Sequence, residues 1–216
     1  MSMLLQPQDR NQLDPSDDSQ FYAFPRFVTH VDEGFIDRLK KLYRDRIPSH
    51  GRVLDLMSSW VSHLPEDVPY TEVVGHGMNR EELAKNPQLS SYFVQDLNAN
   101  PQLPLADARF DAVLIAVSVQ YLQYPEKVFA EIRRVLVPGG VAIVSFSNRM
   151  FYQKAIAAWR EADDRERLEL VKRYFQNAGG FGTPEAIAEP SATPNLLFYL
   201  GLFQGDPFYA AIADRK

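Results

Sequence analysis

RFDAVLIAVSVQYLQYPEKVFAEIRRVLVPGGVAIVSFS, residues 109–147, is the most informative stretch of this chain. The apolar, β-branched run at 111–117 is too short to cross a membrane and predicts a strand buried on both faces. Apolar residues then recur at helical spacing over 126–136, and Pro-Gly-Gly at 138–140 ends that helix. A second buried strand is predicted at 141–146. Strand, helix and strand with short connections form a βαβ unit, so we expect parallel strands and a right-handed crossover.

Strands and helices alternate on both sides of this unit. Other strands are predicted at 51–56, 71–75, 92–95, 183–189 and 208–213. Helices are predicted at 32–46, 60–64, 79–86, 150–160 and 163–178. The last strand follows Asp206-Pro207 and a loop rather than a helix, so it should insert antiparallel. We therefore expect an α/β fold with a doubly wound, Rossmann-like, seven-stranded sheet that is otherwise mostly parallel.

Composition narrows the possible functions. The 216 residues suffice for one α/β domain, and the net charge of −5 argues against nucleic acid as a partner. The chain has no cysteine, so it has no disulfide or thiolate metal site, and we expect no metal. The start, MSMLLQPQDRNQ, lacks a leader pattern, and the apolar run at 196–203 is too short to span a bilayer. We expect a cytoplasmic monomer or homodimer without a membrane partner.

The chain divides into a short N-terminal region and one domain. We expect a tail and aromatic cap segment at 1–31, followed by a single domain at 32–216. Residues 1–20 are polar and predict a mobile tail or a loosely held arm. Residues 21–30, FYAFPRFVTH, combine aromatic side chains with Arg26 and His30. This segment either packs on the domain or covers a ligand.

A ligand site is expected at one edge of the sheet. Doubly wound sheets bind ligands outside the carboxyl ends of their strands, near the point where strand order reverses. The ends of the first four strands should therefore surround one crevice. The segments predicted to line it are 55–59, 76–79, 96–97 and 117–120.

Several blocks resemble one enzyme family. VLDL at 53–56, QDL at 95–97 and LPLADARFDAVLIAVSVQYL at 103–122 resemble blocks of the class I S-adenosylmethionine-dependent methyltransferases. VFAEIRRVLVPGGVAIVS at 128–145 is the most specific of these matches, and DPFYAAIADRK at 206–216 resembles the closing strand. The chain is thus similar to a small-molecule methyltransferase of the type 11-like group, which implies S-adenosylmethionine as its cofactor.

Two departures from the family pattern stand out. The glycine-rich turn after the first strand is replaced by Met57-Ser58-Ser59-Trp60, so the motif is degenerate. The carboxylate that usually ends the second strand and binds the ribose is absent, because His76 and Gly77 stand there. An indole of Trp60 or a thioether of Met57 filling the crevice would rule out the cofactor.

The resemblance implies roles for the crevice residues. It assigns the methionine end to Asp55, Ser58 and Ser59, the ribose to Gly77 and Asn79, and the adenine to Asp96 and Leu97. Met57, Val117 and Ser118 are further candidates for binding the cofactor. Val117 and Ser118 lie at the exit of the fourth strand. The candidate general bases are His76 at a strand exit and His30 in the cap segment, since histidine titrates near neutral pH. Some of these residues also have a structural interpretation. Asp96 could instead cap the backbone of its loop, and the two histidines could be packing residues.

Two functions follow as hypotheses. The first is methyl transfer from S-adenosylmethionine to a small-molecule acceptor. The alternative is a non-catalytic binding or scaffold protein of the same fold with a lapsed cofactor site, using the apolar segment 195–203 as a partner surface. A nicotinamide oxidoreductase is disfavoured, because no G-x-G-x-x-G turn follows the first strand.

Overall fold

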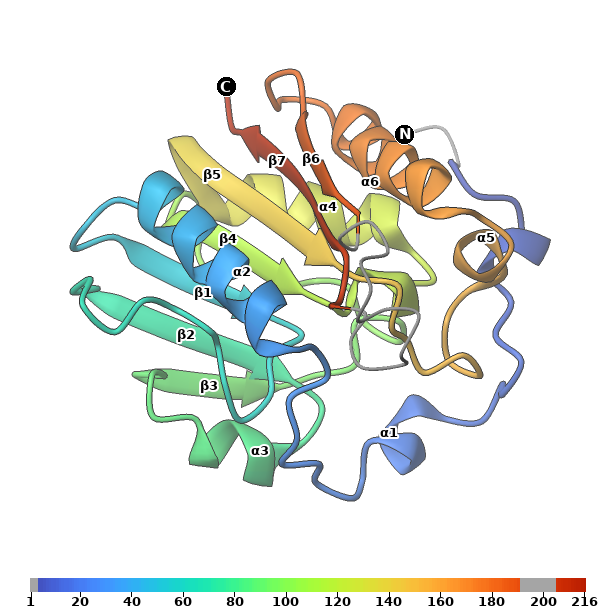
Figure 1. Ribbon diagram of the computed structural model, residues 1–216. Coiled ribbons are helices and arrows are strands. Elements are labelled where there is room, and N and C mark those ends of the chain that lie inside the picture. Colours follow the sequence, from blue (N-terminus) through green and yellow to red (C-terminus); the bar gives the residue numbers. More distant parts are fainter. Residues whose placement is uncertain (1–3, 191–204) are drawn as a thin grey trace, which may run out of the picture.

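The computed structural model describes residues 4–190 and 205–216 and is built on one central sheet (Figure 1). The strands are β1 (Arg52–Leu56), β2 (Glu72–Gly77), β3 (Ser91–Val94), β4 (Phe110–Ala116), β5 (Leu136–Phe146), β6 (Glu185–Glu189) and β7 (Phe208–Asp214). Their order is β3-β2-β1-β4-β5-β7-β6. Strands β1 to β5 pair in parallel, and β7 pairs antiparallel with β5 and β6. The predicted Rossmann-like sheet with an antiparallel last strand is confirmed.

Helices cover both faces of the sheet (Figure 1). They are α1 (Asp18–Phe21), α2 (Glu33–Arg46), α3 (Arg80–Lys85), α4 (Pro125–Val135), α5 (Ala157–Arg160) and α6 (Asp164–Ala178), with short turns η1 (Gln8–Arg10) and η2 (Val119–Tyr121). Along β4, Ala112 and Leu114 belong to the core under α2, whereas Val113 and Ile115 belong to the core under α4 and α6. Because side chains alternate along a strand, the continuous apolar run of β4 serves both cores.

Two predicted helices are not formed as expected. Residues 57–71 connect β1 to β2 without the helix predicted at 60–64. That loop is tied down instead, because Leu64 exchanges two hydrogen bonds with the Gln88 side chain. The helix predicted at 150–160 is reduced to α5, since Ile156 and Ala157 donate their N–H groups to Gln120 and Asn11. Tertiary hydrogen bonds outweigh the local helical pattern in both places.

The N-terminal arm is fixed to the domain over residues 4–20, so the expected tail is wrong there. Arg10 is buried and forms an ion pair with Glu126 of α4, with 2.8 Å between Nη2 and Oε1. The fully buried Lys154 ammonium lies 3.1 Å from Asp18 Oδ1 and donates to the Ser16 carbonyl at 2.7 Å. Buried charges require such partners, so these contacts determine where the arm runs.

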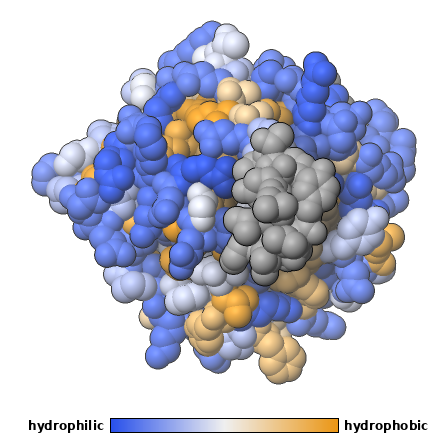
Figure 2. All heavy atoms as spheres, viewed as in Figure 1, coloured by the Kyte–Doolittle hydropathy of each residue, from blue (hydrophilic) through white to orange (hydrophobic). Residues whose placement is uncertain are grey.

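The surface is largely hydrophilic in the view of Figure 2, with limited hydrophobic patches. Over residues 4–190 and 205–216, the model contains no helix with the length and apolar content that a bilayer crossing requires. The apolar segment 195–203, expected as a partner surface, lies outside the described residues.

Candidate functional site

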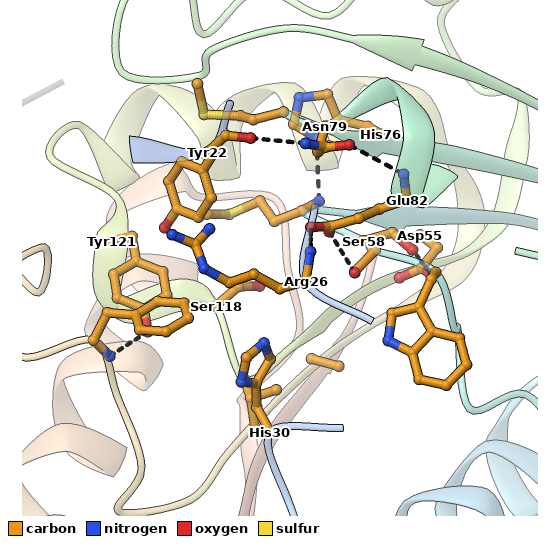
Figure 3. Close-up of a pocket in the computed structure, with 18 of the residues that line it drawn as sticks. Tyr22, Arg26, His30, Asp55, Ser58, His76, Asn79, Glu82, Ser118 and Tyr121 are labelled. Carbon is orange, nitrogen blue, oxygen red and sulfur yellow. Dashed lines mark hydrogen bonds between the residues drawn. The ribbon is translucent and has the colours of Figure 1, made fainter. Parts of the chain in front are cut away.

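A cavity of about 670 Å³ lies at the carboxyl ends of β1, β2 and β4 (Figure 3). Its wall includes all of the site residues predicted from the sequence: His30, Asp55, Met57, Ser58, Ser59, His76, Gly77, Asn79, Asp96, Leu97, Val117 and Ser118. Trp60 donates its indole N–H to the Val28 carbonyl at 3.2 Å. Trp60 and Met57 both form part of the cavity wall. Neither side chain fills the cavity, whose volume is typical of small-molecule sites.

The strand exits on either side of the order reversal are strained. Met57 after β1 has φ of 58° and Val117 after β4 has φ of 46°. Left-handed backbone is costly for residues other than glycine, and most of all for a β-branched residue such as valine. Strain of this kind concentrates at functional sites. Both residues line the cavity, so the fold maintains two strained turns at the same edge.

His76 holds the turn after β1 in place. Its Nδ1 accepts the Met57 N–H at 3.1 Å, its Nε2 lies 2.9 Å from the Gln95 carbonyl, and its own carbonyl accepts the Ser58 N–H at 2.7 Å. Burial lowers the pKa of His76 to about 4, so the ring is neutral at pH 7. Both ring nitrogens are engaged, so His76 positions the turn and no longer stands as a candidate base.

Asp55 is a buried carboxylate at the end of β1. It is 3% exposed, and Oδ2 accepts the Ser58 hydroxyl at 2.5 Å. Burial raises its pKa to about 6, against the opposing effect of hydrogen bonds from Ser58 and Ser62. Within the described part of the chain, no cationic side chain lies within 4.0 Å of it. A cationic group of a ligand would supply the missing partner.

The side chain of Asn79 is already occupied. Its Oδ1 accepts the N–H groups of Glu81 and Glu82 and so caps α3, while its Nδ2 donates to the carbonyls of Tyr22 and Ala23. Asn79 is thus the N-cap of α3. The hydrogen-bonding capacity that the predicted ribose contact would use goes instead to capping α3 and to anchoring the cap segment.

Gly77 is closely covered by the turn after β1. A Cβ atom at this position would lie 2.5 Å from the Ser58 carbonyl oxygen and 3.3 Å from Leu83 Cδ2. A carboxylate introduced here to bind ribose would displace the turn that carries Ser58.

Gly77→Ala is expected to destabilise the protein by roughly 1–3 kcal/mol, because an added methyl group overpacks the contact with Ser58. Gly77→Asp should be at least as unstable and should gain no cofactor affinity. The free energy of unfolding from urea titration checks this. Gly182→Ala is the matched control, since its Cβ meets only Asp214 O at 3.7 Å. If the Gly77→Ala and Gly182→Ala variants were equally stable, the close contact between position 77 and the Ser58 carbonyl would be contradicted.

The exits of β3 and β4 complete the far wall. Asp96 Oδ1 accepts the Asn98 N–H at 2.8 Å, so it caps its own loop, and Leu97 beside it is buried. The Ser118 hydroxyl is buried and has no hydrogen-bond partner among the residues that the structure describes. Buried hydroxyls normally have partners, so Ser118 offers an unused donor and acceptor to a ligand.

The cap segment forms part of the cavity wall. Asn79 holds the Tyr22 and Ala23 carbonyls, and the Arg26 N–H donates to Glu82 Oε1 at 2.6 Å. His30 also lines the cavity, with its ring centroid 5.2 Å from that of Phe151. The segment thus packs on the domain and also lines the cavity, so both expected interpretations agree with this arrangement.

Several lining residues were missed from the sequence, among them Glu82 and Phe151. Asn79 and Glu82 have the spacing of a capping box, which predicts a carboxylate that bonds back to the helix start. Glu82 instead accepts from Arg26 and from the Ser59 hydroxyl at 2.6 Å. Phe151 lies in a segment predicted as a helix and gave no separate signal.

Comparisons with known proteins agree with this fold. The family model described as "Methyltransferase domain" matches residues 57–144. The biotin biosynthesis bifunctional protein BioHC of Teredinibacter turnerae is 30% identical over 103 residues, 45% of this chain. The match spans only 17% of that relative's length.

Solved structures share the fold at low sequence identity. An S-adenosylmethionine-dependent methyltransferase from Mesorhizobium loti is 17% identical, with a TM-score of 0.54 over 81% of this chain and 96% of that one. The [4+2]-cyclase SpnF is 18% identical, with a TM-score of 0.58 over 83% of this chain and 80% of that one. At these identities the likeness establishes the fold alone.

Proposed function

We propose that this chain, which carries the methyltransferase domain of the class I S-adenosylmethionine-dependent family, transfers a methyl group to a small-molecule acceptor. The observation that supports this most strongly is the cavity itself. It lies at the carboxyl edge of the sheet, stays open beside Trp60, and contains Asp55 without a cationic partner among the described residues. Ligand sites of doubly wound sheets lie at this edge.

The lining residues fit the parts of the cofactor. The Asp55 carboxylate suits the ammonium of the methionine end, and the free oxygen of Asp96 suits the adenine amine beside apolar Leu97. Glu82 is the carboxylate nearest in sequence to Gly77 on this wall, and we assign the ribose to the acceptor sites that it retains beside its bonds from Arg26 and Ser59. The unused Ser118 hydroxyl offers a further contact.

The cofactor supplies a methyl group on a sulfonium, which a nucleophilic atom of the acceptor displaces in line. The chain's own part is to align the reactants and exclude water. His30 is the remaining candidate base. Burial lowers its pKa, Arg26 adds to this lowering and Glu82 opposes it, so the ring is neutral at pH 7. A neutral imidazole in the cavity can accept the proton that the acceptor loses.

Isothermal titration with S-adenosylhomocysteine at pH 7.5 tests the proposal. We expect saturable one-site binding, and no binding of NADH, an adenosine-containing ligand for which the chain lacks the glycine-rich turn. His30→Gln should leave this affinity unchanged, because His30 acts on the acceptor. Absence of heat with 1 mM S-adenosylhomocysteine, roughly the weak limit of specific binding, would remove the proposal.

A non-catalytic ligand-binding protein is the second candidate. It is favoured by the engaged side chain of Asn79 and by the crowding of Gly77, which together leave the usual ribose contact unfilled. The same titration separates the two candidates, since a lapsed cofactor site gives no binding.

A further inference from the structure

We infer that Arg26 binds a carboxylate on the acceptor molecule; this rests on the proposed function, in which the donor occupies the other half of the cavity. Arg26 belongs to the cap segment, lines the cavity and is partly buried. Figure 3 shows its side chain extending across the cavity toward Tyr22 and Tyr121, away from Asp55 and Ser58. The guanidinium therefore lies on the side opposite the predicted methionine contacts.

The guanidinium of Arg26 has no carboxylate partner among the described residues. The buried Arg10 and the partly buried Arg109 do have one, in Glu126 and Glu72. Arg133 and Arg215, also partly buried, donate to backbone carbonyls. Within residues 4–190 and 205–216, the Arg26 guanidinium donates one hydrogen bond, from Nη2 to the Phe21 carbonyl at 2.9 Å. A charge withdrawn from water is normally paired, so the missing anion is best supplied by a ligand.

Three aromatic rings lie close to this guanidinium. Its central carbon lies 4.6 Å from the Phe21 ring centroid, 5.3 Å from that of Phe151 and 5.9 Å from that of Tyr22. Ring contacts use the faces of the planar group, whereas a carboxylate binds its N–H edge. The hydrogen bond from the Arg26 backbone N–H to Glu82 also fixes the backbone of the cap segment at this residue. The group is thus pre-organised for a planar anion.

The neighbouring carboxylates do not supply the missing charge. Asp18 pairs with Lys154 at 3.1 Å and accepts from Asn98. Glu82 accepts from the Arg26 backbone and the Ser59 hydroxyl. The rings of Phe21, Tyr22, Tyr121 and Phe151 pack against one another beside this guanidinium. The acceptor that fits is a carboxylate carried on a mainly apolar body.

The test uses 3-phenylpropanoate and its uncharged amide, 3-phenylpropanamide, as probes. Titration is followed by the side-chain Nε–Hε signal of Arg26 in nitrogen-15-labelled protein, assigned by its loss in Arg26→Gln. We expect the carboxylate to shift this signal and to bind about tenfold or more tightly than the amide. Arg26→Gln should lose that preference, and Arg26→Lys, which keeps the charge, should retain part of it. Arg80→Gln, which removes an exposed arginine of α3, should match the wild type.

Equal binding of acid and amide, or an unchanged preference in Arg26→Gln, would overturn the inference. A second comparison distinguishes the acceptor from the donor. If Arg26→Gln weakens S-adenosylhomocysteine but not 5′-methylthioadenosine, which lacks the amino-acid end, then Arg26 holds the donor carboxylate and the acceptor assignment is wrong. If wild type binds no S-adenosylhomocysteine, the proposed function fails, while the acid and amide comparison still decides whether Arg26 binds a carboxylate.

Discussion

Asp55→Asn is expected to stabilise the protein at pH 7.5 while weakening its binding of S-adenosylhomocysteine. Burial raises the pKa of Asp55 from 3.8 to about 6, so the folded state holds this proton more tightly than the unfolded chain does. The stability that the protonated carboxyl contributes is therefore fully present below pH 3.8 and lost as the pH rises through 6. Two pKa units correspond to about 3 kcal/mol.

Asparagine at position 55 keeps a side-chain oxygen that accepts the Ser58 hydroxyl, but it cannot ionise as the Asp55 carboxyl does. Unfolding of Asp55→Asn at pH 7.5 should cost roughly 1–3 kcal/mol more than that of the wild type, with a smaller difference at pH 4. Because a ligand ammonium then loses its counter-ion, affinity for S-adenosylhomocysteine should fall roughly 10- to 100-fold. In the wild type this affinity should increase from pH 5 to pH 7.5, as Asp55 ionises.

Urea unfolding and isothermal titration across pH measure both effects. Asp37→Asn, on the exposed side of α2, is the control and should change neither. A destabilised Asp55→Asn variant, or one with wild-type affinity, would mean that Asp55 is a structural acceptor and not the ammonium site.

Lys154→Met is expected to lower stability by about 3 kcal/mol or more and to release the N-terminal arm. The Lys154 side chain is fully buried, with Nζ 3.4 Å from Asp14 Oδ2 and 3.1 Å from Asp18 Oδ1. Removing one partner of a buried ion pair leaves the other charge without compensation, which costs more than the pair is worth. Asp18 begins α1, which leads into the cap segment, so cleavage of the arm by a protease should accelerate.

The double variant Lys154→Met with Asp18→Asn separates the uncompensated charge from lost packing. It should recover part of the stability, because no carboxylate is then left unpaired at Asp18. A Lys154→Met variant within about 0.5 kcal/mol of the wild type, the range of ordinary surface substitutions, would show that the arm is not part of the folded unit.

The sheet was predictable because its signals are local. A continuous apolar run marks β4, and Asp32 and Asn79 cap α2 and α3 as their residue types predict. The loop after β1 was not predictable, because its conformation depends on Gln88, which lies beyond β2 in the sequence. The arm was also misjudged, since its polar residues meet Lys154 and Glu126 only in the fold.

The position of the site followed from topology, but the roles of its residues did not. The strand-end rule placed Asp55, His76 and Ser118 around one cavity. Whether a polar side chain there is free depends on contacts across the fold. His76 and Asn79 are engaged by Met57, Gln95 and the cap segment, and neither engagement leaves a trace in the local sequence.

The central claim is that this cavity receives the adenosyl cofactor between Asp55 and Asp96. A crystal structure of the chain soaked with S-adenosylhomocysteine tests it most directly. We predict density in the cavity, with the ammonium against Asp55 and the adenine amine against Asp96. A saturating soak that leaves the cavity without ligand density, or places the ligand elsewhere on the protein, would contradict the claim.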